Sequence, residues 1–444
     1  MSSSEVKTGR VQKSSAQRHL NAGIFVGVVL VFLTYLLMSQ QFAFGAPYEN
    51  GTVVCSWEGR LSESCEISGD IRVNGTSRSA FLVPTSQSEH REWQIRPYSR
   101  KNVDAIKKVT ITQLPDDRSA APACTTATYA VPAVLFALGG LTGNIFHDYA
   151  DVLVPLFVAS RRYAGEVQFL VANLGDRPAW PGKYITLLRV LSKYDVVDLD
   201  AADAHVMRCF RRLTVGLHIH KEFTVVPEMA AADEGRRRRR LAMADFTRFQ
   251  REAYGLPRVD VAPREPGKRQ PRLMLLRRSH YRRFVNEEEI VRAAAAAAGF
   301  EAEAVELNGD EMPVAEQARR VNSFDVLVAV HGAGLTTEVF LPPGGVVIQV
   351  VPFGKTEFIA RVEYGEPAVD MGLKYIYYNI GLEESTLLEM FGPDHPAIRD
   401  PDSIHRKGWL TVYEYYLRKQ DIRINITRFA PALAQAMDHL RRQH

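Results

Sequence analysis

The amino-acid sequence predicts an α/β protein with two facing doubly wound, Rossmann-like domains behind an N-terminal transmembrane helix. Buried-strand patterns run into glycine-containing turns at residues 139–144 and again at 331–334, which predicts the two domains and a cleft between them. The transmembrane helix is predicted by 29 residues, Leu20 to Tyr48, that contain no Asp, Glu, Lys, Arg or His. This stretch is long enough to cross a bilayer as a helix.

Length and charge limit the classes of protein to which the chain can belong. Its 444 residues suffice for two domains with additional segments. Hydrophobic residues make up 46% and charged residues 24%, as is ordinary for a globular protein. The formal net charge of +4 is small, and much of the excess lies in the run Arg236 to Arg240. We therefore expect no nucleic-acid partner.

The N-terminal segment has the charge pattern of a signal anchor. Basic residues outnumber the single acidic residue, Glu5, ahead of the apolar stretch. Because positive charge stays in the cytosol, we expect a cytosolic tail at 1–19, a membrane helix at 20–44 and a stem at 45–54. A cleaved signal peptide is the alternative interpretation, since residues 43–46 include small residues. The apolar region of such a signal peptide would be unusually long, which favours an uncleaved anchor.

Two further patterns agree with a lumenal location. Sequons for N-glycosylation begin at Asn50, Asn74 and Asn425. All four cysteines lie in the proposed lumenal part, where disulfides persist. They are Cys55, Cys65, Cys124 and Cys209. The spacing of the first two permits a bridge across a hairpin, and the sequence leaves the pairing open.

Residues 55–256 are expected to form the first domain. Short strands and turns extend to residue 114, and an α/β pattern follows. The predicted strands are 133–138, 167–171 and 196–199, and the predicted helices are 145–159 and 184–191. Residues 236–253 have the pattern of a basic helix, whose charges we interpret as solvated.

Residues 257–271 contain four prolines and are predicted to link this domain to a second one at 272–444. The predicted strands there are 273–276, 301–306, 326–330 and 346–350, and the predicted helices are 287–298, 312–323 and 335–340. Gly299 is expected to end the first of these helices. We expect the C-terminal helix to pack back on the first domain.

The most informative motif is the valine-rich strand 326–330 with the turn that follows it. A strand, a small-residue turn and a helix N-terminus place backbone N–H groups and a positive helix end together, where phosphates bind. Gly332 and Gly334 lack a Cβ and let a ligand approach closely, and His331 can donate to a phosphate or sugar oxygen. A tight turn with a structural histidine is the alternative interpretation.

A second motif follows the predicted strand 133–138. A helix that begins near Asn144 places His147 and Asp151 at positions i and i+4 of one face. A carboxylate beside an imidazole fixes its tautomer and raises its basicity, as a general base requires. A capped helix with a buried His–Asp hydrogen bond is the alternative interpretation.

Arginines follow the predicted strand 273–276, at the carboxyl edge where sheets of this kind bind ligands. They are Arg277, Arg278, Arg282 and Arg283. Guanidinium groups suit a diphosphate through bidentate donation, although a surface charge cluster is the alternative.

Asp-x-Asp patterns begin at Asp198 and Asp400, but so short a pattern recurs by chance. We assign no metal to either.

In their order, these motifs resemble plant glycosyltransferase family 61, which includes grass xylan arabinofuranosyl- and xylosyltransferases. The resemblance covers nearly all of the chain after the stem. Its segments are Cys55, Cys65 to Arg72, Ile95 to Lys101, Gly139 to Pro155, Arg282 to Glu288, His331 to Thr336, Phe340 to Gly344, Glu384 to Leu387 and Asp394 to Pro396. Thr337 departs from the asparagine that is frequent there in the family, and Tyr281 lengthens the arginine segment by one residue.

The resemblance implies a GT-B-like fold, an inverting mechanism, a UDP-pentose donor and no metal or other cofactor. Residues 55–256 would be the acceptor-side domain and 272–444 the nucleotide-sugar-binding domain. His147 would be the catalytic base and Asp151 its partner. The donor-binding residues would be Asn144, Arg278, Arg282, Arg283, His331, Gly332, Ala333, Gly334, Leu335 and Thr336.

The resemblance also implies a location and an acceptor. We expect a single-pass type II protein of the Golgi membrane whose lumenal part transfers arabinofuranose or xylose to xylan or xylo-oligosaccharides, in complexes with other Golgi glycosyltransferases. Two alternatives stay open. One is the family's N-glycan core β-1,2-xylosyltransferase, and the other is a non-catalytic polysaccharide-binding or assembly subunit.

Overall fold

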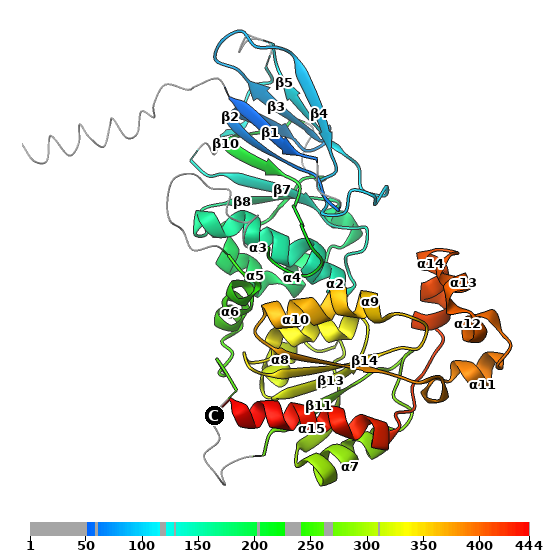
Figure 1. Ribbon diagram of the computed structural model, residues 1–444. Coiled ribbons are helices and arrows are strands. Elements are labelled where there is room, and N and C mark those ends of the chain that lie inside the picture. The colour runs from blue at the N-terminus through cyan, green and yellow to red at the C-terminus, as the bar shows by residue number, and fades with distance from the viewer. Residues whose placement is uncertain are drawn as a thin grey trace, which may run out of the picture. The chain divides into compact units, whose positions relative to one another are not determined.

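The computed structural model describes residues 51–57, 61–115, 121–127, 130–201, 205–226, 241–261, 270–309 and 311–443. The predicted tail, the membrane helix at 20–44, Asn50 and the arginine run at 236–240 lie outside these residues. No helix within the described ranges is long and apolar enough to cross a membrane. Residues 51–444 form one unit that contains two β-sheets (Figure 1).

The first sheet has ten strands in the order β4-β5-β3-β2-β10-β7-β8-β9, with β1 beside β2 and β6 beside β10. These strands are β1 (Thr52–Ser56), β2 (Ser64–Asn74), β3 (Ser79–Val83), β4 (Arg91–Ile95), β5 (Val109–Gln113), β6 (Thr126–Ala127), β7 (Ala133–Ala137), β8 (Gln168–Ala172), β9 (Val197–Asp198) and β10 (Met207–Val215). The portion β10-β7-β8-β9 is parallel, whereas β2 pairs antiparallel with β1, β3 and β10.

The first half is therefore a mixed sheet, and our expectation of a doubly wound domain holds only for its parallel portion. The physical reason lies in β2, where buried positions alternate with less buried ones through much of the strand. Such alternation is typical of an antiparallel sheet with one covered face. The short strands expected before residue 114 form this extension, in which the β3–β5 pair is parallel and the other pairs are antiparallel.

Helical segments of the first half follow β7, β8 and β10. They are α2 (Ile145–His147), η1 (Asp148–Leu153), α3 (Val154–Ser160), η2 (Arg161–Tyr163), η3 (Leu174–Asp176), α4 (Trp180–Lys183), α5 (Ile185–Leu191) and α6 (Met243–Tyr254). The predicted helix 145–159 is confirmed as the continuous segment α2-η1-α3, in which η1 is a π-helix. π-Helical turns of this kind occur frequently at functional sites.

The second sheet is entirely parallel and doubly wound. Its strands, in the order β12-β11-β13-β14-β15, are β11 (Arg272–Arg277), β12 (Glu301–Glu306), β13 (Val326–Val330), β14 (Val346–Val351) and β15 (Lys374–Asn379). The chain order reverses between β11 and β13, and ligands of such folds bind at the carboxyl ends of the strands at this switch point. The four predicted strands are confirmed, and β15 is an additional strand.

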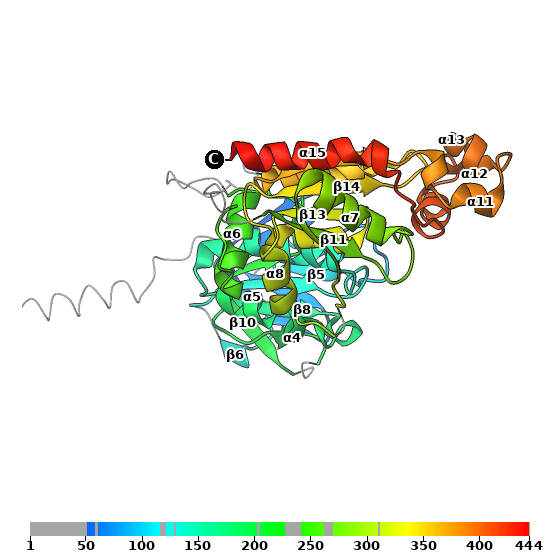
Figure 2. The same ribbon diagram turned by 90° about the horizontal axis from the view of Figure 1, so that it is seen from below.

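Helical segments of the second half are α7 (Glu287–Ala298), α8 (Val314–Asn322), η4 (Ala333–Phe340), α9 (Glu357–Ala360), η5 (Arg361–Gly365), α10 (Glu366–Asp370), η6 (Leu382–Glu384), α11 (Leu387–Phe391), α12 (Pro396–Arg399), α13 (Pro401–His405), α14 (Trp409–Val412), η7 (Tyr413–Leu417) and α15 (Ile426–Arg442). Gly299 ends α7 in the left-handed conformation, as expected. The C-terminal helix α15 lies along the second half, in contact with α7, β14 and β15 (Figure 2). Our expectation that it packs on the first domain is wrong, because its buried side chains, such as Phe429 and Leu433, belong to the core of the second sheet.

The two halves share a hydrophobic core. One buried cluster contains Phe146 and Phe223 from the first half together with Phe340 and Tyr364 from the second. The helix α6 also joins the halves, because it contacts α5 on one side and α8, η4 and α10 on the other. Residues on both sides of the predicted linker are thus parts of one packed body.

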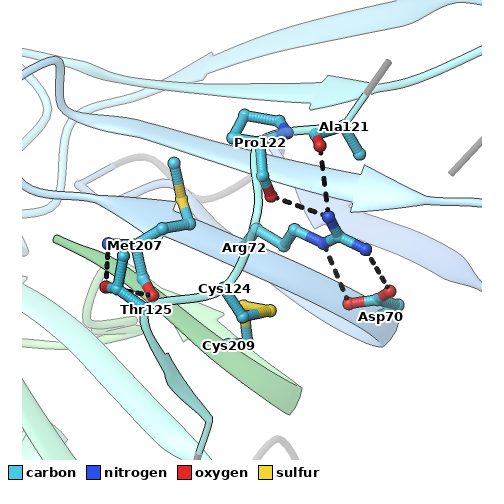
Figure 3. The surroundings of a disulfide bond; sticks show 8 residues. All are labelled: Asp70, Arg72, Ala121, Pro122, Cys124, Thr125, Met207 and Cys209. Atoms are coloured by element: carbon cyan, nitrogen blue, oxygen red, sulfur yellow. Dashed lines mark hydrogen bonds and ion pairs between the residues drawn. A yellow bond between two sulfur atoms is a disulfide. The ribbon is translucent and has the colours of Figure 1, made fainter. Parts of the chain in front are cut away.

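Two disulfides fix the first sheet, and they settle the pairing that the sequence leaves open. Cys55–Cys65 joins the paired strands β1 and β2, and Cys124–Cys209 joins the segment before β6 to β10 (Figure 3). Beside the second bridge, Arg72 Nη1 donates to the carbonyl oxygens of Ala121 (3.3 Å) and Pro122 (2.7 Å). The segment is therefore held to the sheet by covalent and polar contacts together.

Candidate active site

The carboxyl ends of β11 and β13 bring two of the sequence motifs together. The strands are neighbours, with Leu275 opposite Val328, so Arg278 and His331 follow at equivalent positions three residues later. Both strands are buried, as their apolar sequences require. The arginine segment and the histidine–glycine turn therefore meet at the switch point of the second sheet.

The four arginines divide into two pairs with different partners. Arg277 forms an ion pair with Glu287 (2.7 Å), and Arg283 forms one with Asp421 (2.6 Å). Arg278 and Arg282 have no carboxylate within ion-pair distance among the described residues. We therefore remove Arg283 from the expected donor-binding group, because Asp421 already neutralises it.

The guanidinium groups of Arg278 and Arg282 lie against the backbone of Gly332. A Cβ atom at Gly332 would stand 2.9 Å from Nη2 of Arg282 and 3.0 Å from Nη1 of Arg278. Gly332 also has φ 142°, which a residue with a side chain rarely adopts. At Gly334, a Cβ would instead meet the side chain of Leu276 at 3.1 Å. The absence of a side chain at Gly332 therefore allows both guanidinium groups to lie against the backbone of the turn.

Charge at this turn is uncompensated. Burial, and then the neighbouring charge of Arg278, lower the pKa of Arg282 to about 10. The Nε atom of Arg282 is buried and has no hydrogen-bond partner among the described residues. Two cations close enough to repel one another, beside the N-terminus of η4, favour a bound anion. The helix that opens here is a 3₁₀ helix rather than the α-helix expected from the turn.

His331 is buried and neutral. Burial, followed by the charges of Arg282 and Arg278, lowers its pKa to about 3. Its Nδ1 accepts a hydrogen bond from the side-chain amide of Gln349 (3.0 Å), which in turn accepts one from the Tyr375 hydroxyl (2.8 Å). The proton therefore resides on Nε2, which is free to donate to a ligand oxygen. Ala333 and Gly334 are half-buried behind it, and Leu335 and Thr336 are fully buried.

The first half contributes His147 and Asp151, which are hydrogen-bonded as the spacing predicts. Nδ1 of His147 lies 3.0 Å from Oδ2 of Asp151. The carboxyl is completely buried, while 21% of the imidazole is exposed. Asn144, expected in the donor site, is exposed and caps α2 by accepting the N–H of Phe146 (3.0 Å). A carboxylate on Nδ1 leaves Nε2 of His147 as the basic atom.

Asp151 is held in its ionised form by partners from another segment. Tyr98 donates to it (2.7 Å), and Arg100 pairs with it (2.7 Å). Burial alone would raise the pKa of Asp151, but the hydrogen bond from His147 and the charge of Arg100 outweigh burial and lower it. Arg100 also binds both carboxylate oxygens of Glu222 (3.0 and 2.7 Å).

Asp148 is a buried residue of this region that the sequence reasoning missed. It accepts hydrogen bonds from Gly143 N–H (2.8 Å), Trp180 Nε1 (2.9 Å) and the Tyr184 hydroxyl (2.8 Å). These bonds tie the glycine turn to α4 and α5. Asp148 thereby supports the start of α2, from which His147 projects. Its side-chain partners Trp180 and Tyr184 lie more than thirty residues further along the chain, and the local sequence gives no signal of them.

The His147 group and the Gly332 group meet where the halves pack together. Phe146, next to His147, lies 5.4 Å from the ring of Tyr364, and Tyr364 lies 5.6 Å from the ring of His331. The helices α2 and η4 are also in contact. A basic imidazole on one half and a cationic turn on the other thus adjoin one interface. This arrangement suits proton removal on one side and stabilisation of an anion on the other.

Other predicted residues lie away from this interface or have different partners. Asp198 caps its own turn by accepting the Asp200 N–H (3.0 Å), and Asp200 pairs with Arg78 (2.8 Å). Of the two described sequons, Asn74 is buried, whereas Asn425 is exposed.

Comparison with known proteins decides the family. The model of the family described as Glycosyltransferase 61 matches residues 143–348, which include both groups of the site. A β-1,2-xylosyltransferase of rice, Oryza sativa subsp. japonica, is 41% identical over 87% of this chain and 84% of its own length. The chain belongs to glycosyltransferase family 61.

Two further relatives show how far the similarity extends. An α-1,3-arabinosyltransferase of rice is 39% identical over 87% of this chain, and the match spans 65% of that relative. A xylan glycosyltransferase of Arabidopsis thaliana is 34% identical over 87% of this chain and 79% of its own length. The two rice relatives are thus named for two different pentosyl transfers, xylosyl and arabinosyl.

Proposed function

We propose that this family 61 protein is an inverting pentosyltransferase that moves xylose or arabinofuranose from a UDP-sugar to xylan. The observation that carries the proposal is the uncompensated pair Arg278 and Arg282 at Gly332, across the interface from the His147–Asp151 pair. Relatives named for xylosyl and arabinosyl transfer support the same assignment.

The chain's own residues supply the chemistry of a single displacement. Nε2 of His147 takes the proton of an acceptor hydroxyl, and the oxygen forms a bond to the anomeric carbon as the bond to the diphosphate breaks. Attack opposite the leaving group inverts the configuration. Arg278, Arg282 and Nε2–H of His331 stabilise the charge that leaves with UDP. We propose no metal, because cations of the protein occupy that role.

The test is transfer by the purified protein from UDP-xylose and from UDP-arabinofuranose to xylo-oligosaccharides, with anomeric configuration read by NMR. We expect one donor to be used and one inverted linkage to form. Transfer to an N-glycan core and not to xylo-oligosaccharides would show that the acceptor is an N-glycan rather than xylan. No transfer from either donor would contradict the proposal.

We also propose that the protein is a single-pass type II protein of the Golgi membrane with its catalytic part in the lumen, where other glycosyltransferases are its neighbours. The uncharged segment at 20–44, the preceding basic residues and the two disulfides support this location. Protease treatment of intact Golgi vesicles tests it. Digestion of the C-terminal bulk without detergent would contradict it.

A further inference from the structure

The carboxyl group of Glu363 lies beside His331, at the edge of the proposed anion site. Glu363 belongs to η5, and 26% of its side chain is exposed. Its Oε2 lies 3.7 Å from Nε2 of His331, too far for a hydrogen bond. No other polar partner of this carboxyl occurs among the described residues.

Charges from both halves act on Glu363. Burial and the charge of Glu222 raise its pKa to about 7, while Arg100 and Arg282 act in the opposite direction. Glu222 and Arg100 belong to the network that holds Asp151 and His147. Arg282 and His331 belong to the cationic turn. Glu363 therefore lies beside His331 of the anion site and within electrostatic reach of the residues that hold the base.

The order of groups in a displacement places the transferred sugar in this position. The sugar is bonded to the diphosphate at the anomeric carbon, and the acceptor oxygen approaches that carbon from the opposite side. The sugar must then occupy the space between the cationic turn and His147. A carboxyl group located there faces hydroxyl groups rather than phosphates.

We propose that Glu363 binds the transferred sugar by accepting a hydrogen bond from one of its hydroxyl groups. This inference rests on the proposed function, which it extends to the sugar part of the donor. A sugar hydroxyl supplies the hydrogen-bond donor that the half-buried carboxyl lacks among the described residues of the free protein. Glu222 is less suited to this role, because Arg100 already occupies both of its oxygens.

Separate calorimetric titrations with UDP and with the UDP-pentose that the enzyme uses distinguish sugar binding from nucleotide binding. Glu363→Ala should weaken binding of the UDP-pentose by about 10- to 100-fold, as expected for a hydrogen bond to a charged acceptor. Binding of UDP alone should change less than about twofold, because UDP carries no sugar at this position. Glu363→Gln keeps the shape of the side chain and should give a smaller loss of the same kind.

Glu357→Gln is the matched control, since Glu357 is exposed on α9, just before η5. Its affinities for both ligands should equal those of the unaltered protein. Equal affinity of Glu363→Ala and the unaltered protein for the UDP-pentose would overturn the inference. So would a parallel loss of UDP binding, because Glu363 would then act on the nucleotide or on folding. Failure of the unaltered protein to bind UDP would instead overturn the proposed function itself.

Discussion

Gly332 and Arg282 are in contact so close that a Cβ on the glycine would stand 2.9 Å from Nη2 of the arginine. The contact joins residues that lie 50 positions apart in the sequence, because β11 and β13 are neighbours in the second sheet. The backbone of the turn and the guanidinium group therefore act on a ligand as one surface.

Substitution of Gly332 should disturb nucleotide binding. In Gly332→Ala, the methyl group displaces the two guanidinium groups, and φ 142° becomes unfavourable. Loss of one charge-assisted hydrogen bond alone would weaken UDP binding by at least about tenfold in calorimetry. Gly372→Ala is the control, because Gly372 also has a positive φ (82°) but no atom near its Cβ position. Equal UDP affinity in the two variants would place the diphosphate elsewhere.

His147 should affect turnover and leave nucleotide binding intact. Removal of a positioned base in His147→Ala should lower the turnover number by about 10²-fold or more. UDP affinity should stay nearly constant, since the imidazole belongs to the other half of the site. Full activity of a folded His147→Ala protein would exclude the base assignment, and the exposed His90 provides a neutral control in His90→Ala.

Glu363 should make stability depend on pH. Its pKa rises from an ordinary 4.5 to about 7 in the folded state, so below about pH 4.5 it is protonated in both states. As the pH rises towards 7, the unfolded chain releases the proton first, and the folded state loses stability. Glu363→Gln should therefore gain about 3 kcal/mol of unfolding free energy over the unaltered protein between pH 4.5 and pH 8. A pH-independent difference in urea unfolding would contradict this expectation.

The two disulfides should contribute unequally to stability. Cys124–Cys209 closes 85 residues and Cys55–Cys65 closes 10. Chain entropy predicts losses of about 4–5 kcal/mol and about 3 kcal/mol when the respective pairs are replaced by serine. Urea unfolding of the two double variants measures the difference. A larger loss from the shorter loop would show that local strain or packing outweighs chain entropy.

Glycosylation should favour Asn425 over Asn74. The Oδ1 atom of Asn425 caps α15 by accepting the N–H of Arg428 (3.2 Å), while its side chain remains exposed for a glycan at Nδ2. Asn74 is 8% exposed, and its Nδ2 points to the carbonyl of Val206 at 3.5 Å. When the protein is taken from the secretory pathway, Asn425→Gln should migrate faster on a gel than the unaltered protein, because it lacks one glycan. Asn74→Gln should migrate like the unaltered protein. The reverse pattern would contradict the assignment.

Patterns within short segments predicted the second half well. The valine-rich strand β13, the alanine-rich helix α7 and its terminal Gly299 follow directly from local sequence preferences. The His147–Asp151 pair likewise depends only on helical spacing. In each case the sequence signal and the structural contact lie within one or two turns of the same element.

Contacts between segments that lie far apart in the sequence could not be predicted from such local patterns. β10 occupies the middle of the first sheet, but Arg208, Arg211 and Arg212 interrupt its apolar pattern. The division of four arginines into bound and unbound pairs depends on Asp421, which is 138 residues from Arg283. Glu363 carries no motif, and only the packing of η5 within the second half places it beside His331.

The core shared by the two halves limits how such an enzyme can evolve. Phe146 and Tyr364 pack against each other, and α6 contacts both sheets' helices. A chimera that takes its donor half from a relative would have to match these surfaces, or it would expose aromatic rings and lose the alignment of His147 with the anion site. New donor preferences are therefore expected to arise through point substitutions around positions such as 363 rather than through exchange of whole modules.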